Sequence, residues 1–210
     1  MDLMNTVKAE PVLVIMRNVP TDIIIDYAKS IIDGGVNFFE VALNSKDALN
    51  QITMLKKIYG DRATIGAGTA ITVERAKAAI DAGADFLLAP STDEPVLAYC
   101  QKNGIALMPG ALTPSDVSLC VRYGFNLIKL FPAGDMPRGD IKSLKGPFDD
   151  TDYVAIGGVN KENAAEFIKQ GYLGIGLGSN LLAKEVIANR DWETATKQVA
   201  ALAEAIKNAK

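Results

Sequence analysis

The sequence contains no histidine, and this absence excludes more chemistry than any other feature of its composition. Ser–His and Cys–His nucleophile pairs are excluded, as are metal sites built on imidazole ligands. Acid–base chemistry must therefore use Asp, Glu, Lys, Tyr or Cys side chains. Only two cysteines are present, Cys100 and Cys120, which is too few for a zinc site or a disulfide framework, so we expect buried free thiols.

The sequence also lacks the features of membrane and nucleic-acid-binding proteins. No apolar run approaches the roughly 20 residues of a membrane-spanning helix. Residues 1–10 lack the basic-then-apolar order of a signal peptide, so we expect a cytoplasmic protein without a membrane partner. With 22 Lys and Arg against 25 Asp and Glu, and no basic stripe, nucleic acid is not an expected partner. The 210 residues and their 49% hydrophobic content predict one globular domain spanning residues 1–210.

Glycine recurs regularly, and helical-looking segments repeatedly end at it before a short apolar run begins. Glycine just past a helix end commonly adopts the left-handed conformation that closes the helix. The glycines are Gly35, Gly60, Gly83, Gly104, Gly124, Gly146 and Gly171. One apolar run before the first glycine and one after each of the seven make up the set of predicted strands, which are Val12–Arg17, Asn37–Leu43, Ala63–Ala67, Phe86–Ala89, Ala106–Pro109, Leu127–Phe131, Tyr153–Ile156 and Leu173–Leu177.

These strands alternate with amphipathic segments and predict an α/β protein with a TIM (β/α)8 barrel. Thr72–Ala82 is one such segment, with Val73, Ala76 and Ile80 at helical spacing. Strands separated by helices pair in parallel, and eight such units in this length predict a compact barrel. The alternative is an open, doubly wound sheet of flavodoxin type, which usually has about five or six strands, so eight units favour the barrel.

Three charged side chains interrupt strands that a parallel sheet should bury on both faces. Lys129 lies within a strand, where burying its charge is costly unless its pKa falls. A lysine that is partly neutral can attack a ketone. The alternative is a lysine whose charged head extends to water at the barrel mouth. Glu40 suits a general base, or a structural ion pair with Lys129. Arg17 ends the first strand and suits a substrate carboxylate, or simply faces water. Together they predict an active site, because barrels draw catalytic residues from several strand ends.

Glycine turns follow the last two predicted strands, where TIM barrels often bind phosphate. Gly157 and Gly158 follow one strand, and Gly178 and Ser179 follow the other. Glycine lets backbone N–H groups approach phosphate oxygens, although plain tight turns would show the same pattern. The chain has no Walker-type motif, so a P-loop nucleotide site is not supported.

Several segments, taken in order, resemble one enzyme family over nearly the whole chain. They are Glu40–Leu43 (EVAL), Ile65–Thr69 (IGAGT), Pro90, Pro109–Gly110 and Ile128–Ala133 (IKLFPA). The chain thereby resembles the 2-keto-3-deoxy-6-phosphogluconate (KDPG) and 4-hydroxy-2-oxoglutarate (KHG) aldolases. The resemblance implies a class I aldolase on a TIM barrel, without metal or cofactor and assembled as a homotrimer, whose partners are a phosphorylated keto acid and pyruvate.

The resemblance also implies roles for individual residues. Lys129 would be the Schiff-base lysine, and Glu40 the general acid and base. The substrate-binding residues implied near the pyruvate half are Arg17, Thr69 and Pro90, and Phe131 is a further substrate-binding residue. Those implied near the phosphate are Gly157, Gly158, Gly178 and Ser179.

The expected reaction is cleavage of KDPG to pyruvate and glyceraldehyde 3-phosphate, with KHG as a further substrate. Leu43-Asn44-Ser45 replaces the Leu-Arg-Thr of phosphogluconate-type members and is closer to the 6-phosphogalactonate (KDPGal) branch, so KDPGal is the alternative substrate. Ile156 stands where threonine is common, whereas Lys145–Phe148 (KGPF) is closer to the gluconate branch.

Two different functions would share parts of this pattern. A metal-dependent phosphosugar isomerase or synthase would also use a barrel, but the lack of histidine and the lysine in the sixth predicted strand count against it. A non-catalytic phosphosugar-binding protein would keep the glycine turns, because fold alone does not fix function. Such a protein would not need both Lys129 and Glu40, so we favour the aldolase.

Overall fold

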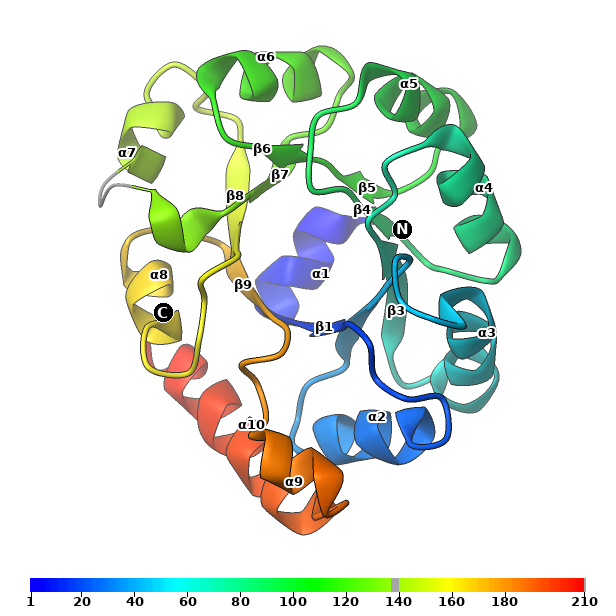
Figure 1. Ribbon diagram of the computed structural model, residues 1–210. Coiled ribbons are helices and arrows are strands. Elements are labelled where there is room, and N and C mark those ends of the chain that lie inside the picture. The colour runs from blue at the N-terminus through cyan, green and yellow to red at the C-terminus, as the bar shows by residue number, and fades with distance from the viewer. Residues whose placement is uncertain (137–139, 210) are drawn as a thin grey trace.

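The computed structural model describes residues 1–136 and 140–209 as a barrel of parallel strands surrounded by helices, which confirms the predicted TIM-type fold (Figure 1). The strands are β1 Val12–Met16, β2 Phe38–Ala42, β3 Thr64–Gly68, β4 Leu87–Leu88, β5 Leu107–Met108, β6 Gly110–Ala111, β7 Leu127–Leu130, β8 Asp152–Ile156 and β9 Gly174–Leu177. The helices are α1 Leu3–Ala9, α2 Ile24–Asp33, α3 Ala48–Tyr59, α4 Val73–Asp81, α5 Glu94–Asn103, α6 Pro114–Arg122, η1 Ala133–Asp135, α7 Asp140–Lys145, α8 Ala164–Lys169, α9 Lys184–Ala188 and α10 Trp192–Lys207. Within the described residues, none of these helices combines the length and apolar character needed to span a bilayer.

The predicted fifth strand, Ala106–Pro109, is interrupted at Pro109, so the described residues contain nine strands instead of the predicted eight. Proline has no N–H to donate to a neighbouring strand and interrupts regular pairing there. β5 pairs with β4 while β6 pairs with β7, and the sheet order is β5-β4-β3-β2-β1-β9-β8-β7-β6. The split strand therefore joins the two ends of the sheet. At this seam the Lys129 N–H donates to the Pro109 carbonyl at 2.9 Å.

The barrel interior is filled by side chains that alternate along the strands. A single buried cluster contains Leu3, Val7, Leu13, Ile15, Phe38, Phe86, Leu88, Met108, Leu127, Val154 and Ile156. The rings of Phe38 and Phe86 lie 5.0 Å apart, and glycines face the large side chains. A Cβ on Gly66 would lie 2.3 Å from the Phe86 ring, and one on Gly176 would lie 2.7 Å from Ile156. Large residues thus fill the space that glycines leave, as small barrels require.

Helix α1 closes the N-terminal end of the barrel, although no structure was predicted for residues 1–10. The carboxylate of Asp2 caps this helix by accepting a hydrogen bond from the Asn5 N–H at 3.1 Å. Leu3 and Val7 are one helical turn apart, only 7% and 1% exposed, and belong to the interior cluster. Figure 1, viewed along the barrel, shows α1 behind the ring of strands. The barrel therefore has a closed floor.

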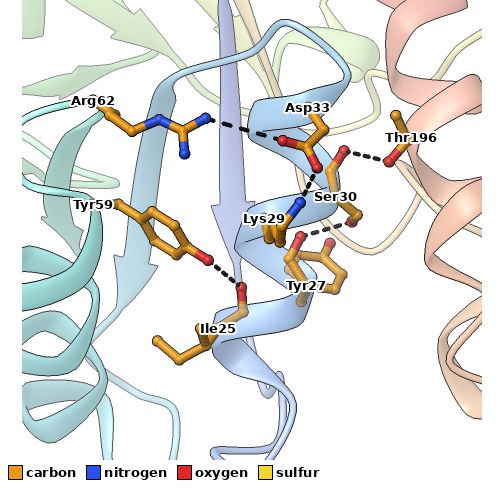
Figure 2. A network of polar contacts seen from close by, with 8 residues as sticks. All are labelled: Ile25, Tyr27, Lys29, Ser30, Asp33, Tyr59, Arg62 and Thr196. Carbon is orange, nitrogen blue, oxygen red and sulfur yellow. Dashed lines mark hydrogen bonds and ion pairs between the residues drawn. The ribbon is translucent and has the colours of Figure 1, made fainter.

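Helix α2 lies between α3 and the last helix, α10, and contacts both (Figure 1). The Tyr59 hydroxyl of α3 donates to a backbone carbonyl of α2 at 3.2 Å, and the Thr196 hydroxyl of α10 donates to the Ser30 carbonyl at 3.1 Å (Figure 2). The rings of Trp192 and Tyr27 pack edge to face, with centroids 6.4 Å apart. The last helix is thereby fixed against the first helix of the barrel wall.

Most of the predicted helix-ending glycines have the expected left-handed conformation, but two do not. Gly35, Gly83, Gly104, Gly124 and Gly171 have positive φ, whereas Gly146 does not and Gly60 has a φ of −57°. At Gly60 the chain continues through one more turn, in which the Arg62 and Ala63 N–H groups donate to the Tyr59 carbonyl. The prediction of a left-handed cap is therefore wrong at these two glycines.

The floor of the barrel can be tested by substitution. Leu3→Ala should lower the free energy of unfolding by about 2–3 kcal/mol, because it removes buried methyl groups and leaves a cavity. Leu49→Ala is a matched control, since Leu49 lies in the first turn of α3 but is 42% exposed, and its effect should stay within about 0.5 kcal/mol. Urea unfolding of both variants measures the difference, and equal losses would contradict a closing role for α1.

Candidate active site

A cavity of about 380 Å³ opens at the C-terminal ends of the strands, on the side opposite α1. TIM-barrel enzymes carry their active sites at this end. The described residues on its walls include most of the predicted site residues, namely Arg17, Glu40, Lys129, Phe131, Gly157, Gly158, Gly178 and Ser179. The structure thus brings the predicted nucleophile, base and anion-binding turns to one cavity.

Lys129 is presented to this cavity by β7 and is only 5% exposed. Its Nζ lies 4.6 Å from the centre of the Phe131 ring, which follows two residues later. Burial lowers the pKa of Lys129; the carboxylate of Glu40 opposes this shift, and the charge of Arg17 adds to it. A larger fraction of this amine is therefore uncharged than in an exposed lysine, and the uncharged amine is the nucleophilic form.

Glu40 reaches the cavity from β2 and is only 2% exposed. Burial raises the pKa of Glu40 to about 7, against the opposing effects of the positive charges of Lys129 and Arg17. Its Oε2 atom is buried and has no hydrogen-bond partner. The structural ion pair with Lys129 that the sequence left open is therefore not formed through Oε2. A carboxyl with this pKa and a free oxygen can exchange protons near neutral pH.

The strand pattern explains how both groups enter the barrel. Glu40 is in register with Ile15 of β1 and Gly66 of β3, and Lys129 with Gly110 of β6. β2 and β7 are not neighbours in the sheet, so the carboxylate and the amine approach from separate walls. The exposed Arg17 follows β1 directly and lies at the cavity edge.

The turn after β8 requires glycine for both backbone conformation and packing. Gly157 and Gly158 have φ values of 86° and 73°. A Cβ on Gly157 would lie 2.9 Å from the Phe131 ring, and one on Gly158 would lie 2.8 Å from the Gly134 Cα. The Gly134 N–H and the Asn163 side-chain amide donate to the carbonyls of Gly157 and Gly158, respectively. The turn is therefore fixed in shape at the cavity wall.

Two predicted substrate-binding residues, Thr69 and Pro90, are not among the residues that line the cavity. Thr69 has a φ of 62°, an uncommon conformation for a β-branched residue, and its hydroxyl donates to the Asn44 side chain at 3.3 Å. That hydrogen bond directs the Thr69 hydroxyl toward the loop after β2. The backbone of Pro90 packs against Gly110 of the split strand, where a Cβ would lie 2.4 Å from the Pro90 carbonyl carbon.

The cavity also contains residues for which no site role was predicted. They are Ile15, Asn18, Ile156, Val159, Gly176 and Asn180. Side chains alternate along β1 and β8, and this alternation places Ile15 and Ile156 inside the barrel, so the sequence contained a signal for these two residues. Asn18 has a φ of 55°, and its N–H donates to the Ser45 hydroxyl at 2.9 Å. This hydrogen bond forms because the loops after β1 and β2 meet, and neither loop has a sequence pattern that would predict it.

A larger cavity of about 560 Å³ lies at the opposite end of the barrel, between α1 and the end of α10. Its walls include Glu10, Pro11, Val36 and Lys207, and none of the predicted site residues. We place the chemistry in the smaller cavity, because that one contains the buried Glu40 and Lys129 with shifted pKa values. In residues 1–136 and 140–209 no group of three His, Cys, Asp or Glu residues is suited to hold a metal ion.

Comparison with known proteins agrees with this geometry. The family model for KDPG and KHG aldolases matches residues 3–198. A 2-dehydro-3-deoxy-6-phosphogalactonate aldolase from Escherichia coli (strain K12) is 30% identical over 200 residues, covering 95% of this chain and 96% of the relative.

Two solved structures extend the comparison. A KDPG aldolase from Legionella pneumophila, with pyruvate captured at low pH as a covalent carbinolamine intermediate, has a TM-score of 0.88 and 28% identity over 96% of this chain and 98% of its own. A cube-shaped protein cage designed by fusing symmetric oligomeric domains has a TM-score of 0.86 and 30% identity over 95% of this chain and 73% of its own. The predicted family is confirmed: the chain belongs to the KDPG and KHG aldolases and is a carbon–carbon lyase.

Proposed function

We propose that this aldolase cleaves a phosphorylated 2-keto-3-deoxy sugar acid, with KDPG as its first substrate, through a Schiff base on Lys129. The observation that carries the proposal is the pairing of a buried amine of lowered pKa with a buried carboxyl whose Oε2 is free, in one cavity. The captured carbinolamine in the Legionella pneumophila relative supports it, because a carbinolamine is the adduct that precedes a Schiff base.

The reaction would begin with attack of the uncharged Lys129 amine on the C2 ketone. The carbinolamine formed then takes up a proton, loses water and becomes a protonated imine. Its positive charge accepts the electron pair released when C3–C4 breaks, so the imine lowers the barrier to cleavage. The lowered pKa of Lys129 favours the first step, because a protonated amine has no electron pair to donate.

Glu40 would carry the protons. Its carboxylate takes the proton of the C4 hydroxyl, directly or through a water, as C3–C4 breaks and glyceraldehyde 3-phosphate forms. The remaining enamine takes a proton at C3 from Glu40 and becomes the imine of pyruvate, which water hydrolyses to pyruvate and free Lys129. A pKa of about 7 lets the carboxyl accept a proton in one step and return it in the next.

The remaining cavity residues would bind the two ends of the substrate. Arg17 suits the carboxylate at the pyruvate end, since its fork-shaped guanidinium can donate two parallel hydrogen bonds. The turns that contain Gly157, Gly158, Gly178 and Ser179 suit the phosphate, whose oxygens accept from backbone N–H groups. Phe131 covers the Lys129 amine between these ends. Thr69 and Pro90 are left outside this set of contacts.

KDPGal is a second candidate substrate, and KHG a third. Asn44, where the gluconate branch has arginine, and the apolar Ile156 on the cavity wall favour KDPGal, as does the similarity to the galactonate aldolase. We further propose a homotrimer; the similarity to a cage designed by fusing symmetric oligomeric domains supports an oligomer. The cytoplasmic location and the absence of a metal or cofactor stay predictions.

The Schiff base can be trapped without knowing the aldehyde. Incubation with pyruvate and borohydride should leave a reduced pyruvyl group on Lys129, located by peptide mass spectrometry. Lys129→Ala should remove the adduct and lower the cleavage rate on the order of 1000-fold or more. The exposed Lys46 lies near the cavity mouth, and Lys46→Ala should retain the adduct. A folded wild-type protein that gives no adduct would remove the nucleophile from the proposal.

The raised pKa of Glu40 makes stability depend on pH. The folded protein binds the proton more tightly than the unfolded chain, so the stabilisation is complete below pH 4.5 and is lost as pH rises through about 7. Relative to Glu40→Gln, the wild type should therefore lose up to about 3 kcal/mol between these limits. Urea unfolding at pH values on both sides of 7 measures this loss. Glu204→Gln, at an exposed glutamate of α10, keeps Glu40 and is the control, so it should lose stability over this range as the wild type does.

We propose that the preference between the two C4 epimers depends on position 156, where Ile156 lies on the cavity wall and has no hydroxyl to donate. Ile156→Thr should shift the ratio of kcat/KM toward KDPG and away from KDPGal by about tenfold, the effect of one added hydrogen bond. Ile156→Val has nearly the same shape as the threonine variant and should leave the ratio unchanged. If both variants shifted the ratio equally, the effect would come from side-chain size and not from hydrogen bonding.

A further inference from the structure

The carboxyl group of Glu40 occupies a space that exists because position 68 is glycine. A Cβ built on Gly68 would lie 1.4 Å from Glu40 Oε1, 2.0 Å from Cδ and 2.7 Å from Cγ. These distances are far below van der Waals contact, so no larger residue at position 68 is compatible with the observed position of Glu40. Gly68 is itself buried at the C-terminal end of β3.

The other inward-facing glycines make room for apolar side chains instead. Gly66, two residues earlier on β3, faces the Phe86 ring, and Gly176 faces Ile156. Gly68 does not have the positive φ at which side chains are strained, so its backbone conformation suits any L-residue. What glycine supplies at this position is therefore space for the carboxyl group, and not a special backbone conformation.

The recess at Gly68 also fixes the height of the carboxyl group within the barrel. The backbone of Glu40 is in register with Gly66, but its Oε1 lies against Gly68, one inward-facing residue closer to the cavity mouth. The side chain therefore extends toward the C-terminal end, where the cavity opens. Oε1 occupies the recess and Oε2 remains without a partner.

We infer that Gly68 is a positioning residue for the aldol reaction: the recess left by its missing side chain holds the Glu40 carboxyl where it exchanges protons with the substrate on Lys129. This inference rests on the proposed role of Glu40. Gly68→Ala would place a methyl group where the carboxyl group lies. Because the carboxyl is the end of a flexible side chain, it would move while the fold is kept.

Exchange of the methyl protons of pyruvate with deuterated water isolates the step concerned. Pyruvate forms the imine on Lys129, a methyl proton passes to the Glu40 carboxylate, and the C–H electron pair forms the enamine. The carboxyl group exchanges this proton for a deuteron of the water, and the deuteron then returns to the same carbon. This exchange needs no aldehyde, so it is independent of the epimer preference. Borohydride trapping of pyruvate, measured in parallel, reports imine formation alone.

We expect Gly68→Ala to slow the exchange by about 100-fold, the effect of a displacement near 1 Å, while trapping on Lys129 is nearly unchanged. Adding Glu40→Asp to Gly68→Ala should restore the exchange by about tenfold over Gly68→Ala alone, because aspartate lacks the atoms that overlap the new methyl group most closely and keeps only Cγ, 2.7 Å away, as its carboxyl carbon. Glu40→Asp alone should slow the exchange. Gly66→Ala is the matched control, since it affects packing at Phe86, and Glu40→Asp should not rescue it.

Each outcome of this experiment has a definite meaning. Unchanged exchange in Gly68→Ala, or additive losses in the double variant, would overturn the positioning role. If Gly68→Ala does not fold, the double variant should fold, because aspartate reduces the overlap from 1.4 Å at Oε1 to 2.7 Å at Cγ; failure of both to fold would also overturn it. If the wild type itself traps no pyruvate, the proposed function fails, and that result is separate from any effect of Gly68.

Discussion

The site depends on the free-energy cost of placing two ionisable groups in the apolar interior of a barrel. Lys129 and Glu40 have opposite charges, and each favours the charged form of the other. Burial nevertheless prevails at both, since the lysine pKa is lowered and the glutamate pKa is raised. The amine and the carboxyl are thereby both shifted toward their neutral forms. A lysine and a glutamate exposed to water would both remain charged near neutral pH, so the amine would not be nucleophilic and the carboxyl would not exchange protons as readily.

The fold provides that environment by dividing the barrel into two levels. Leucine, valine, phenylalanine and methionine side chains fill the lower level, and α1 covers it. The upper level holds the charged groups and the glycine turns, at the end where all the strands terminate. Parallel pairing makes this separation possible, because all the strands run in the same direction and their C-terminal ends lie at the same end of the barrel.

The fold and the chemical groups could be predicted from the sequence, because they leave periodic signals. Lys129 and Glu40 stood out as charges within apolar strands, and the spacing of glycines indicated repeated βα units. The split at Pro109, the folding of residues 1–10 over the barrel floor, and the position of Thr69 outside the cavity could not be predicted. Each depends on contacts between distant segments, such as the hydrogen bond from Thr69 to Asn44. The recess at Gly68 is of the same kind, since a glycine in a strand does not reveal which side chain uses its space.

In the described part of the chain, the site cavity opens at the C-terminal end of the barrel, and α1 and the apolar layer fill the other end. In the proposed reaction, substrate and products would pass through this opening, beside the turns after β8 and β9 and the loop after β1. If the reaction follows the proposed course, the two products leave through the same opening, one after the other. With the proposed substrate bound, its phosphorylated half would lie toward the opening, so bulk water would reach the imine most readily once the aldehyde has left.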